Sequence, residues 1–425
     1  MRIALMTNNY KPFIAGVPIS VERLAKGLEA QGHQVTVFAP TYAEQQEESN
    51  CFRYASFMQK FVGGVVLPNP IDHRIEKEFR KNRYDIIHVH HPMLIGRTAA
   101  YLSKKYDIPL TFTYHTRYEQ YLCYVKGIRM LEQGASRGDT RISRIQGKVL
   151  YGIQEKLVPA YLNTFLKHCH HIFAPTAGMK DYLIEGCGYD PERIDILPTG
   201  IEDKHFHVTD EEKKAIRIRY QAENMPLFLS VSRMAHEKNV SFLLQSIARF
   251  KEQYGRPFRL LMVGDGPNRQ DYEQECMALG ISEEVVFTGK VLNSEIAPYF
   301  AAADSFVFAS KTETQGIVIL EAFAGGTPVI ALDATGVSDL VADGQNGLLC
   351  MEENSDVFAQ KVLDYVTDSR LSGLLSEGAL KSAEEYREEA VAQKAIRIYN
   401  SVIAEYRAEK EMKKERSYHP HMLIG

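Results

Sequence analysis

Two glutamates flank a glycine where an apolar helix is expected to begin. The segment is residues 311–321, KTETQGIVILE, in which Glu313 and Glu321 stand eight positions apart, slightly more than two helical turns. If the chain is helical from Ile317 onward, Glu321 projects from the helix and Glu313 lies in the loop before it. The open N–H groups after Gly316 then attract phosphate or sugar oxygens, and the carboxylates accept hydrogen bonds from hydroxyls. The alternative is a solvated helix with two surface glutamates.

Two further segments carry residues suited to phosphate. After the apolar run 227–232, a loop carries Arg233 and Lys238. Arginine offers a planar fork and lysine a compact charge, so the pair suits a diphosphate, although two cations in a loop are usually just solvated. A glycine turn with Gly264 and Gly266 follows the next apolar run. It lacks the third glycine of a dinucleotide fingerprint, so alone it indicates only that a strand meets a helix.

These segments belong to a regular alternation of apolar strand patterns and helical patterns. That alternation predicts an α/β fold with doubly wound parallel sheets, in which ligands bind at the carboxyl ends of strands. The expected strands are residues 3–6, 35–38, 65–67, 86–89, 110–113, 172–174 and 194–197 in the first half, and 227–232, 260–263, 285–287, 306–309, 329–331 and 348–350 in the second.

Length and composition predict two domains. The 425 residues exceed the size of a single core. The pattern restarts at Leu227 after a polar stretch, which places a hinge near residues 198–201. We therefore expect a first domain at residues 1–200, a second at 201–390, and a last helix with a tail at 391–425.

Charge, cysteines and hydropathy exclude several classes of protein. A net charge of −4 excludes a generally basic nucleic-acid binder, and 45% hydrophobic and 24% charged residues are ordinary for a globular protein. The six cysteines lack the spacing of a zinc site or a disulfide framework, which fits a reducing compartment. The chain opens on a short strand pattern rather than a signal peptide, and no run reaches the roughly 18 apolar residues of a membrane span. We expect a cytoplasmic protein whose contact with a membrane is peripheral.

Taken in order, the motifs resemble those of the retaining family 4 glycosyltransferases. The family's Arg-x(4)-Lys falls on Arg233 and Lys238, its Gly-x-Gly on Gly264 and Gly266, and its Glu-x(7)-Glu on Glu313 and Glu321. A glycine loop at residues 15–17 and a histidine at the end of an expected strand also fit, and the resemblance covers residues 1–405. It implies the GT-B architecture, two Rossmann-like parallel-sheet domains that face a central cleft, with the last helix at 391–425 crossing back onto the first domain.

The resemblance also implies roles for individual residues. A nucleotide sugar, with UDP-glucose the first expectation, is the donor substrate, and neither a metal ion nor another cofactor is required. The implied catalytic residues are Arg233 and Lys238 at the leaving phosphate, Glu313 at the sugar, and His115 at the sugar or the developing positive charge. The implied donor-binding residues are Gly16, Val17, Gly264, Val291, Gln315, Gly316, Ile317 and Glu321, with Glu321 at the ribose and Val291 at the base. For His115 the alternative is a structural histidine inside the first domain.

A basic insert bears on the acceptor. Between His115 and Cys169 the chain has nine Lys and Arg against four Asp and Glu. Four of them share one face of an expected helix, namely Arg137, Arg141, Arg144 and Lys148. This helix either packs on the first domain as an ordinary amphipathic helix or docks on anionic lipid.

Two stretches favour a lipid acceptor. Residues 115–124, HTRYEQYLCY, and the Glu-Thr-Gln-Gly at 313–316 resemble the diacylglycerol glucosyltransferases of bacterial membranes, whereas Asn8-Asn9 departs from their Thr-Asp. The resemblance implies transfer of glucose to diacylglycerol or glucosyl-diacylglycerol at the inner face of the cell membrane, with an α linkage. A transferase with a soluble acceptor, a nucleotide-sugar epimerase and a silent membrane-binding protein stay open, as do the donor sugar and the oligomeric state.

Overall fold

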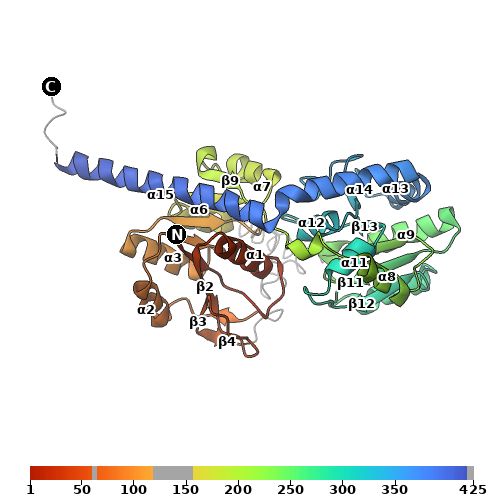
Figure 1. The fold of residues 1–425 in the computed structure, drawn as a ribbon, viewed down its shortest axis with the longest axis horizontal. Coiled ribbons are helices and arrows are strands. Elements are labelled where there is room, and N and C mark those ends of the chain that lie inside the picture. Colours follow the sequence, from red (N-terminus) through yellow and green to blue (C-terminus); the bar gives the residue numbers. More distant parts are fainter. Residues whose placement is uncertain (60–64, 118–156, 419–425) are drawn as a thin grey trace, which may run out of the picture. The chain divides into compact units, whose positions relative to one another are not determined.

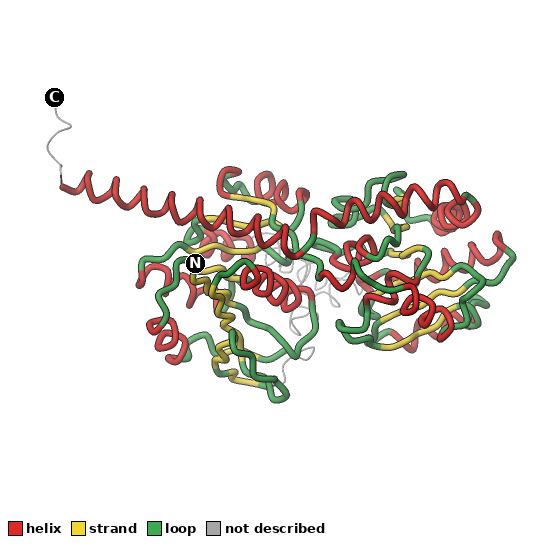
Figure 2. Tube along the Cα trace, viewed as in Figure 1, coloured by secondary structure: helices red, strands yellow, loops and turns green. Residues whose placement is uncertain are grey.

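The computed structural model describes residues 1–59, 65–117 and 157–418. The chain forms two compact units, shown in Figure 1 and, coloured by secondary structure, in Figure 2. Unit 1 comprises Met1–Pro198 and Val391–Gly425, and unit 2 comprises Thr199–Ala390. No helix in the described part of the chain is both long and apolar enough to cross a membrane.

Unit 1 is built on a seven-stranded parallel sheet with the order β3-β2-β1-β6-β7-β8-β9. Its strands are β1 (Arg2–Met6), β2 (Gln34–Pro40), β3 (Cys51–Tyr54), β6 (Ile86–Val89), β7 (Leu110–Thr113), β8 (His171–Ala174) and β9 (Ile194–Ile196). Its helices are α1 (Gly16–Ala30), α2 (His73–Lys81), α3 (Ile95–Tyr106), α6 (Val158–Leu166), α7 (Ala177–Asp181) and α15 (Glu388–Tyr418), which belongs to unit 1 from Val391 on.

The strand expected at residues 65–67 is wrong. The strand that pairs with β2 is β3, four residues of mixed character that lie earlier in the chain. Residues 67 and 68 instead form β5 (Leu67–Pro68), which pairs antiparallel with β4 (Ser56–Met58) in a separate small sheet. An edge strand is covered on fewer sides, so its sequence shows little of the continuous apolar run that marks central parallel strands.

Unit 2 has a six-stranded parallel sheet with the order β12-β11-β10-β13-β14-β15. Its strands are β10 (Leu227–Val231), β11 (Arg259–Val263), β12 (Val285–Gly289), β13 (Ser305–Phe308), β14 (Val329–Leu332) and β15 (Gly347–Cys350). Its helices are α8 (Asp210–Arg219), α9 (Val240–Tyr254), α10 (Arg269–Ala278), α11 (Ala297–Ala302), α12 (Ile317–Ala324), α13 (Ser355–Thr367) and α14 (Ser369–Ala383). The strand order reverses direction between β10 and β13, which is where ligands bind in open parallel sheets.

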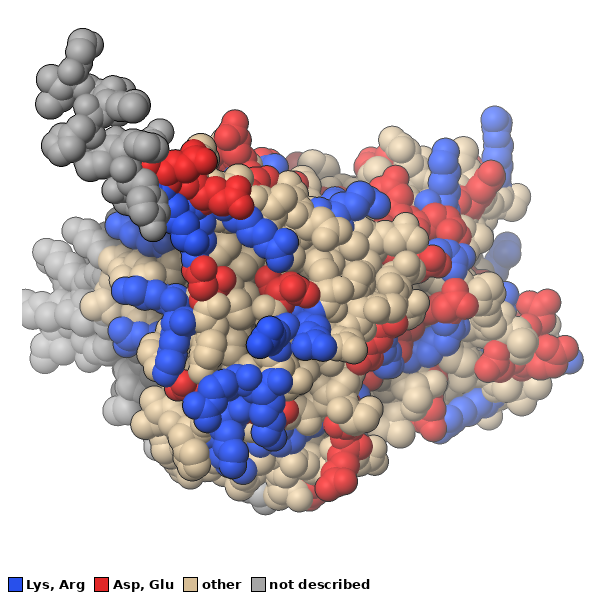
Figure 3. Space-filling model, turned by 60° about the vertical axis from the view of Figure 1, so that its left-hand side comes forward, with Lys and Arg blue, Asp and Glu red and all other residues tan. Residues whose placement is uncertain are grey.

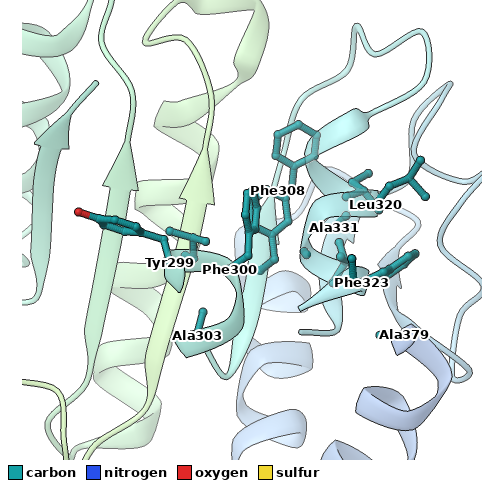
Figure 4. Close-up of a cluster of buried hydrophobic side chains, with 14 of the residues drawn as sticks. Tyr299, Phe300, Ala303, Phe308, Leu320, Phe323, Ala331 and Ala379 are labelled. Carbon is teal, nitrogen blue, oxygen red and sulfur yellow. The ribbon is translucent and has the colours of Figure 1, made fainter. Parts of the chain in front are cut away.

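Hydrophobic clusters cover both faces of the unit 2 sheet. Successive side chains of a strand point to opposite faces, so each strand contributes to both clusters. Leu227 and Leu229 of β10 pack into one hydrophobic cluster, while Phe228 packs into the cluster on the other face. The first cluster also receives Leu320 and Phe323 from α12, as Figure 4 shows. Burial of these apolar side chains therefore fixes α12, the helix that carries the second glutamate of the Glu-x(7)-Glu motif.

Candidate functional site

Lys238 and Glu313 form an ion pair at the carboxyl edge of the unit 2 sheet. Lys238 lies in a short 3-10 helix after β10, and Glu313 lies in the loop between β13 and α12. Since β10 and β13 are neighbours in the sheet, their following loops meet at the same edge. The Lys238 Nζ lies 2.6 Å from Oε1 of Glu313, and the two side chains are 18% and 16% exposed. The sequence placed one residue at a phosphate and the other at a sugar, and the structure brings them together.

Arg233 lies in the loop between β10 and Lys238 and pairs with Glu237. This loop is bonded to the glycine turn after β11: the Met234 N–H donates to the Asp265 carbonyl at 3.1 Å. The contact is so close that a Cβ on Gly264 would lie 2.0 Å from the Ser232 oxygen, and one on Gly266 2.3 Å from the Met234 oxygen. The glycine turn therefore supports the loop that carries Arg233, and only glycine allows this approach.

Gly316 caps the start of α12. Its φ is +71°, in the left-handed region that glycine adopts readily, and no side chain caps the helix there. A Cβ at this position would also meet the Ile319 side chain at 3.0 Å and the Gly336 oxygen at 3.3 Å. The helix begins at Ile317 as the sequence predicts. Its first N–H groups point out of the helix start, the arrangement that binds anions and polar oxygens.

Glu321 is a buried carboxylate on α12. Its side chain contrasts with the rest of the helix, which is apolar, and Oε1 lies 3.8 Å from Nε2 of the fully buried His205. His205 was not singled out from the sequence, because nothing in its neighbourhood marks it as part of a site. A buried carboxylate has a high desolvation cost unless it is hydrogen-bonded or paired, so the polar groups around Glu321 must offset that cost.

Gln315 is bonded to the backbone of Thr199. Its Oε1 accepts from the Thr199 N–H at 2.9 Å, and its Nε2 donates to the Thr199 carbonyl at 3.4 Å. Both residues are buried. The amide keeps a second N–H and a second lone pair, so its bonds to Thr199 leave capacity for the sugar contact that the resemblance implies. Val291 lies just after β12, where Gly289 accepts from the Gly264 N–H at 2.9 Å, so the expected base-binding turn adjoins the glycine turn.

Unit 1 contributes a second group of expected residues. Gly16 and Val17 open α1, whose N-cap Ala15 offers no side-chain acceptor to the first N–H groups. His115 follows β7, and its Nε2 lies 2.8 Å from Nδ1 of His90, which follows the neighbouring strand β6. Burial lowers the pKa of His115 to about 3, so its imidazole is neutral at neutral pH. His90 was missed, although four residues of the sequence, His88-Val89-His90-His91, place polar rings at a strand end.

The basic residues assigned to membrane binding, Arg137, Arg141, Arg144 and Lys148, lie outside the described residues. Among residues 1–59, 65–117 and 157–418, no group of three or more His, Cys, Asp and Glu side chains is arranged to hold a metal ion. In unit 2 the two cations that the sequence assigned to the leaving phosphate each pair with a glutamate, Arg233 with Glu237 and Lys238 with Glu313.

Two parallel sheets, each with candidate site residues at its carboxyl edge, define the fold class. Solved structures with this fold include sucrose-phosphate synthase from Thermosynechococcus elongatus, with a TM-score of 0.73, 19% identity, and coverage of 95% of this chain and 99% of that one. They also include Anabaena HepE in complex with UDP and glucose, with a TM-score of 0.70, 18% identity, and coverage of 94% and 100%. The class is the GT-B glycosyltransferases.

The sequence comparisons give the family. Residues 14–205 match the profile described as Glycosyltransferase Family 4, and residues 211–388 match Glycosyl transferases group 1. The alpha-monoglucosyldiacylglycerol synthase of Streptococcus pneumoniae is 30% identical over 83% of this chain and 76% of that protein. The synthase of the same name from Acholeplasma laidlawii is 28% identical over 95% and 98%. The chain belongs to the family 4 glycosyltransferases and is a hexosyltransferase.

Proposed function

We propose that this enzyme transfers glucose from UDP-glucose to diacylglycerol or glucosyl-diacylglycerol, with retention, at the inner face of the cell membrane. The observation that carries the donor half of this proposal is the Lys238–Glu313 pair beside the open start of α12. The acceptor half draws its support from the two relatives named as alpha-monoglucosyldiacylglycerol synthases. HepE, solved with UDP and glucose, supports the choice of donor.

In this proposal, different residues of unit 2 bind different parts of the donor substrate. Arg233 and Lys238 stabilise the charge that builds on the leaving diphosphate, which lowers the barrier because the charges are already in place. Glu313 and the Gly316 and Ile317 amides position the sugar hydroxyls, and Glu321 accepts from the ribose hydroxyls. A carboxylate acts here only as an acceptor, so two fixed carboxylates can select a ligand rich in hydroxyls.

The transfer step proceeds on one face of the sugar. The acceptor hydroxyl oxygen bonds to the anomeric carbon while the bond from that carbon to the phosphate oxygen breaks. The hydroxyl proton passes to the leaving phosphate, and UDP departs. In the proposed mechanism His115 lies beside the reacting sugar. Since its imidazole is neutral, it adds no charge against the positive charge that develops on the sugar ring.

A basic face on unit 1 supports action at a membrane surface. Exposed cationic side chains lie on α2, in the loop between α2 and β6, and on α3, and Figure 3 shows Lys and Arg gathered on this side of unit 1. They are Arg74, Lys77, Arg80, Lys81, Arg83, Arg97, Lys104 and Lys105. Two large apolar side chains lie among them, Ile71 at 82% and Tyr101 at 52% exposure. Basic residues near anionic lipid each add about 1 kcal/mol of binding.

Identification of the reaction product tests this proposal. The purified enzyme is incubated with UDP-glucose, UDP-galactose or GDP-mannose and with vesicles that contain diacylglycerol or glucosyl-diacylglycerol, or with soluble sugars and inositol phosphate. Mass spectrometry identifies the product, and proton NMR gives its linkage. We expect an α-glucosyl lipid from UDP-glucose. A β linkage contradicts the retaining mechanism, and transfer to a soluble acceptor with none to lipid contradicts the acceptor while it leaves the donor site intact.

A further inference from the structure

Three histidine rings lie against one another at the carboxyl edge of the unit 1 sheet. His88 stacks on His90 with ring centroids 4.3 Å apart, and His90 stacks on His115 at 5.1 Å. In both pairs the ring planes are 25° apart. His88 and His90 are buried, while His115 is partly exposed. The stack therefore leads from the interior of unit 1 to the residue that the family resemblance places at the sugar.

The first ring of the stack is fully bonded. Nδ1 of His88 lies 2.5 Å from the hydroxyl of Tyr399 on α15, and Nε2 lies 2.6 Å from the Thr113 hydroxyl. His90 differs, because its Nδ1 contacts Nε2 of His115 at 2.8 Å while its Nε2 has no hydrogen-bond partner among the described residues. Among the described residues, the His90 ring thus has its hydrogen bond to His115 alone.

The proton between His90 and His115 has two possible places. If Nε2 of His115 donates, neutral His90 carries its proton on Nε2, where a buried N–H lacks an acceptor. If Nδ1 of His90 donates, Nε2 of His90 carries no proton and is a buried acceptor without a donor. His115 then carries its own proton on Nδ1. Buried donors without acceptors are the rarer defect in proteins, so the second arrangement is favoured. Burial and the neighbouring histidines hold the pKa of His90 well below its usual range, so a cationic His90 with protons on both nitrogens is not a third arrangement.

We propose that His90 is a positioning residue that donates from Nδ1 to Nε2 of His115 and so fixes His115 as the Nδ1–H tautomer. His115 then presents an N–H donor, from Nδ1, to an oxygen of the donor sugar or the acceptor. This inference rests on the proposed role of His115 at the reacting sugar. A fixed tautomer matters because a histidine that offers a lone pair where a donor is needed loses its hydrogen bond to the substrate.

Nitrogen-15 NMR of the full-length enzyme labelled at histidine tests the tautomer without substrate. The His115 resonances are assigned from the spectrum of His115→Gln. We expect a protonated Nδ1 and an unprotonated Nε2 in the wild-type enzyme, and a mixture of tautomers in His90→Leu. A protonated Nε2 on His115 in the wild-type enzyme overturns the proposal, whatever the activity of the enzyme.

Activity of two variants of nearly equal shape tests the consequence. Asparagine and leucine both leave space beside His115, but the Asn amide nitrogen stands close to where Nδ1 of His90 stood and can donate. We expect His90→Leu to lower kcat by about tenfold to 100-fold and His90→Asn to restore at least about tenfold of that loss. UDP affinity, measured by calorimetry, should be equal in both variants, since His90 is not among the residues assigned to the nucleotide.

Equal kcat values in His90→Asn and His90→Leu overturn the role of the hydrogen bond. The proposed role of His115 at the reacting sugar fails by a different result, namely a His115→Gln variant that keeps the turnover of the wild-type enzyme, and the proposed function fails by the product that mass spectrometry and proton NMR identify. In that case the NMR measurement still decides whether His90 fixes the tautomer of His115. The two ideas can therefore fail separately.

Discussion

At the scale of single residues, Lys238 is the cation whose surroundings most clearly suit a phosphate. Its partner Glu313 sits in the loop that leads to the open helix start, so the amine lies beside polar groups that a donor substrate needs. An ion pair this sheltered is not there for stability alone, because removing water from two charges costs about as much as their attraction returns. The pair holds both groups in place before the substrate arrives.

The first prediction concerns this lysine. Lys238→Ala should lower kcat by about 100-fold, the loss expected when one fixed donor to a developing negative charge is removed. The control is Lys311→Ala, because Lys311 lies in the same loop as Glu313 but pairs with Glu353 in a half-exposed ion pair. Such pairs contribute about 0–1 kcal/mol, so this variant should keep its turnover. Equal rates in the two variants would remove Lys238 from the site.

The second prediction separates the two glutamates. Glu321→Ala should mainly weaken UDP binding, because Glu321 is assigned to the ribose, whereas Glu313→Gln should lower kcat and leave UDP affinity close to that of the wild-type enzyme. Calorimetry with UDP and steady-state kinetics give both quantities. Similar losses of UDP affinity in both variants contradict the division of roles.

The third prediction concerns acid and the buried histidines of unit 1. Burial lowers the pKa of His91 to about 4 and of His115 to about 3, and that of His88 and His90 well below the usual range. Below pH 6.5 the unfolded chain binds protons that the folded chain does not. The free energy of unfolding should therefore fall as the pH drops from 6.5 toward 4, by up to about 1.4 kcal/mol per pH unit for each such histidine.

Hydrogen exchange at pH 7.5, 6.0 and 5.0 measures this effect by strand. Amides of β6, which adjoins the histidines, should lose protection steeply between pH 6.5 and 5. Amides of β10 in unit 2 serve as the internal control and should change less, because none of these four histidines lies in unit 2. The same loss of protection in both strands would contradict the assignment to the histidines.

At the scale of elements, the start of α12 depends on a single glycine. Gly316 is left-handed, and a Cβ there meets the side chain of Ile319 and the Gly336 oxygen. Gly344 has nearly the same φ, +74°, with nothing within 4 Å of its would-be Cβ. The two positions therefore separate the cost of the backbone conformation from the cost of the contacts.

The fourth prediction uses this pair. Gly344→Ala should lower the free energy of unfolding by about 1 kcal/mol, the cost of a left-handed conformation for a residue with a Cβ. Gly316→Ala should lower it further and also weaken donor binding, because the displaced N–H groups face the site. Urea unfolding and calorimetry with UDP measure both effects. Unchanged donor affinity in Gly316→Ala would separate the helix start from the site.

The strands were predictable where burial on both faces of the sheet requires a continuous run of apolar residues. The central strands β1, β6, β7, β10, β11, β13 and β14 all appear as apolar runs, and the structure places strands there. The edge strand β3 was not predictable, since Cys51 and Arg53 stand in it and one side of an edge strand needs no apolar cover. The fold class followed from the alternation of strands and helices rather than from any one strand.

The motifs and the family resemblance predicted a candidate site, but they did not predict its contacts. The resemblance put Glu313, Glu321 and Lys238 in one predicted site, whereas the pairing of Lys238 with Glu313 depends on the order of strands in the sheet. In the same way, the bond from the Gln315 amide to Thr199 joins residues 116 positions apart. A side-chain amide that bonds the backbone N–H and carbonyl of a distant residue cannot be recognised from the spacing of residues in the sequence.

At the scale of the whole molecule, the chain passes between the units twice. The first passage follows Pro198 and the second precedes Val391. Within unit 2 the two segments are bonded to each other, since the Ile201 N–H donates to the Tyr386 carbonyl at 2.7 Å and the Glu388 N–H donates to the Ile201 carbonyl at 3.1 Å. The Gln315 amide ties the first segment to the loop that carries Glu313. Hydrogen bonds therefore link the loop that carries Glu313 to both segments in which the chain passes between the units.

The last prediction concerns the basic face of unit 1. Lys77 and Arg80 are exposed on α2, and no ion pair joins either to another residue in the described part of the chain. Lys77→Glu/Arg80→Glu should weaken binding to vesicles with anionic lipid by about tenfold or more, since four units of charge change at a surface where each is worth about 1 kcal/mol. The matched control is Arg370→Glu/Lys381→Glu, which changes the same charge on the exposed surface of α14.

Cosedimentation with neutral and anionic vesicles at low and physiological salt measures the binding. The wild-type enzyme should bind anionic vesicles, and the binding should weaken with salt because exposed charges are screened beyond about 8 Å at physiological ionic strength. Both double variants should keep the turnover of the wild-type enzyme on diacylglycerol dispersed in detergent, because their side chains lie outside the donor site. Only the α2 variant should lose activity on anionic vesicles. Equal binding of the wild-type enzyme to neutral and anionic vesicles would show that this basic face does not direct the enzyme to its lipid.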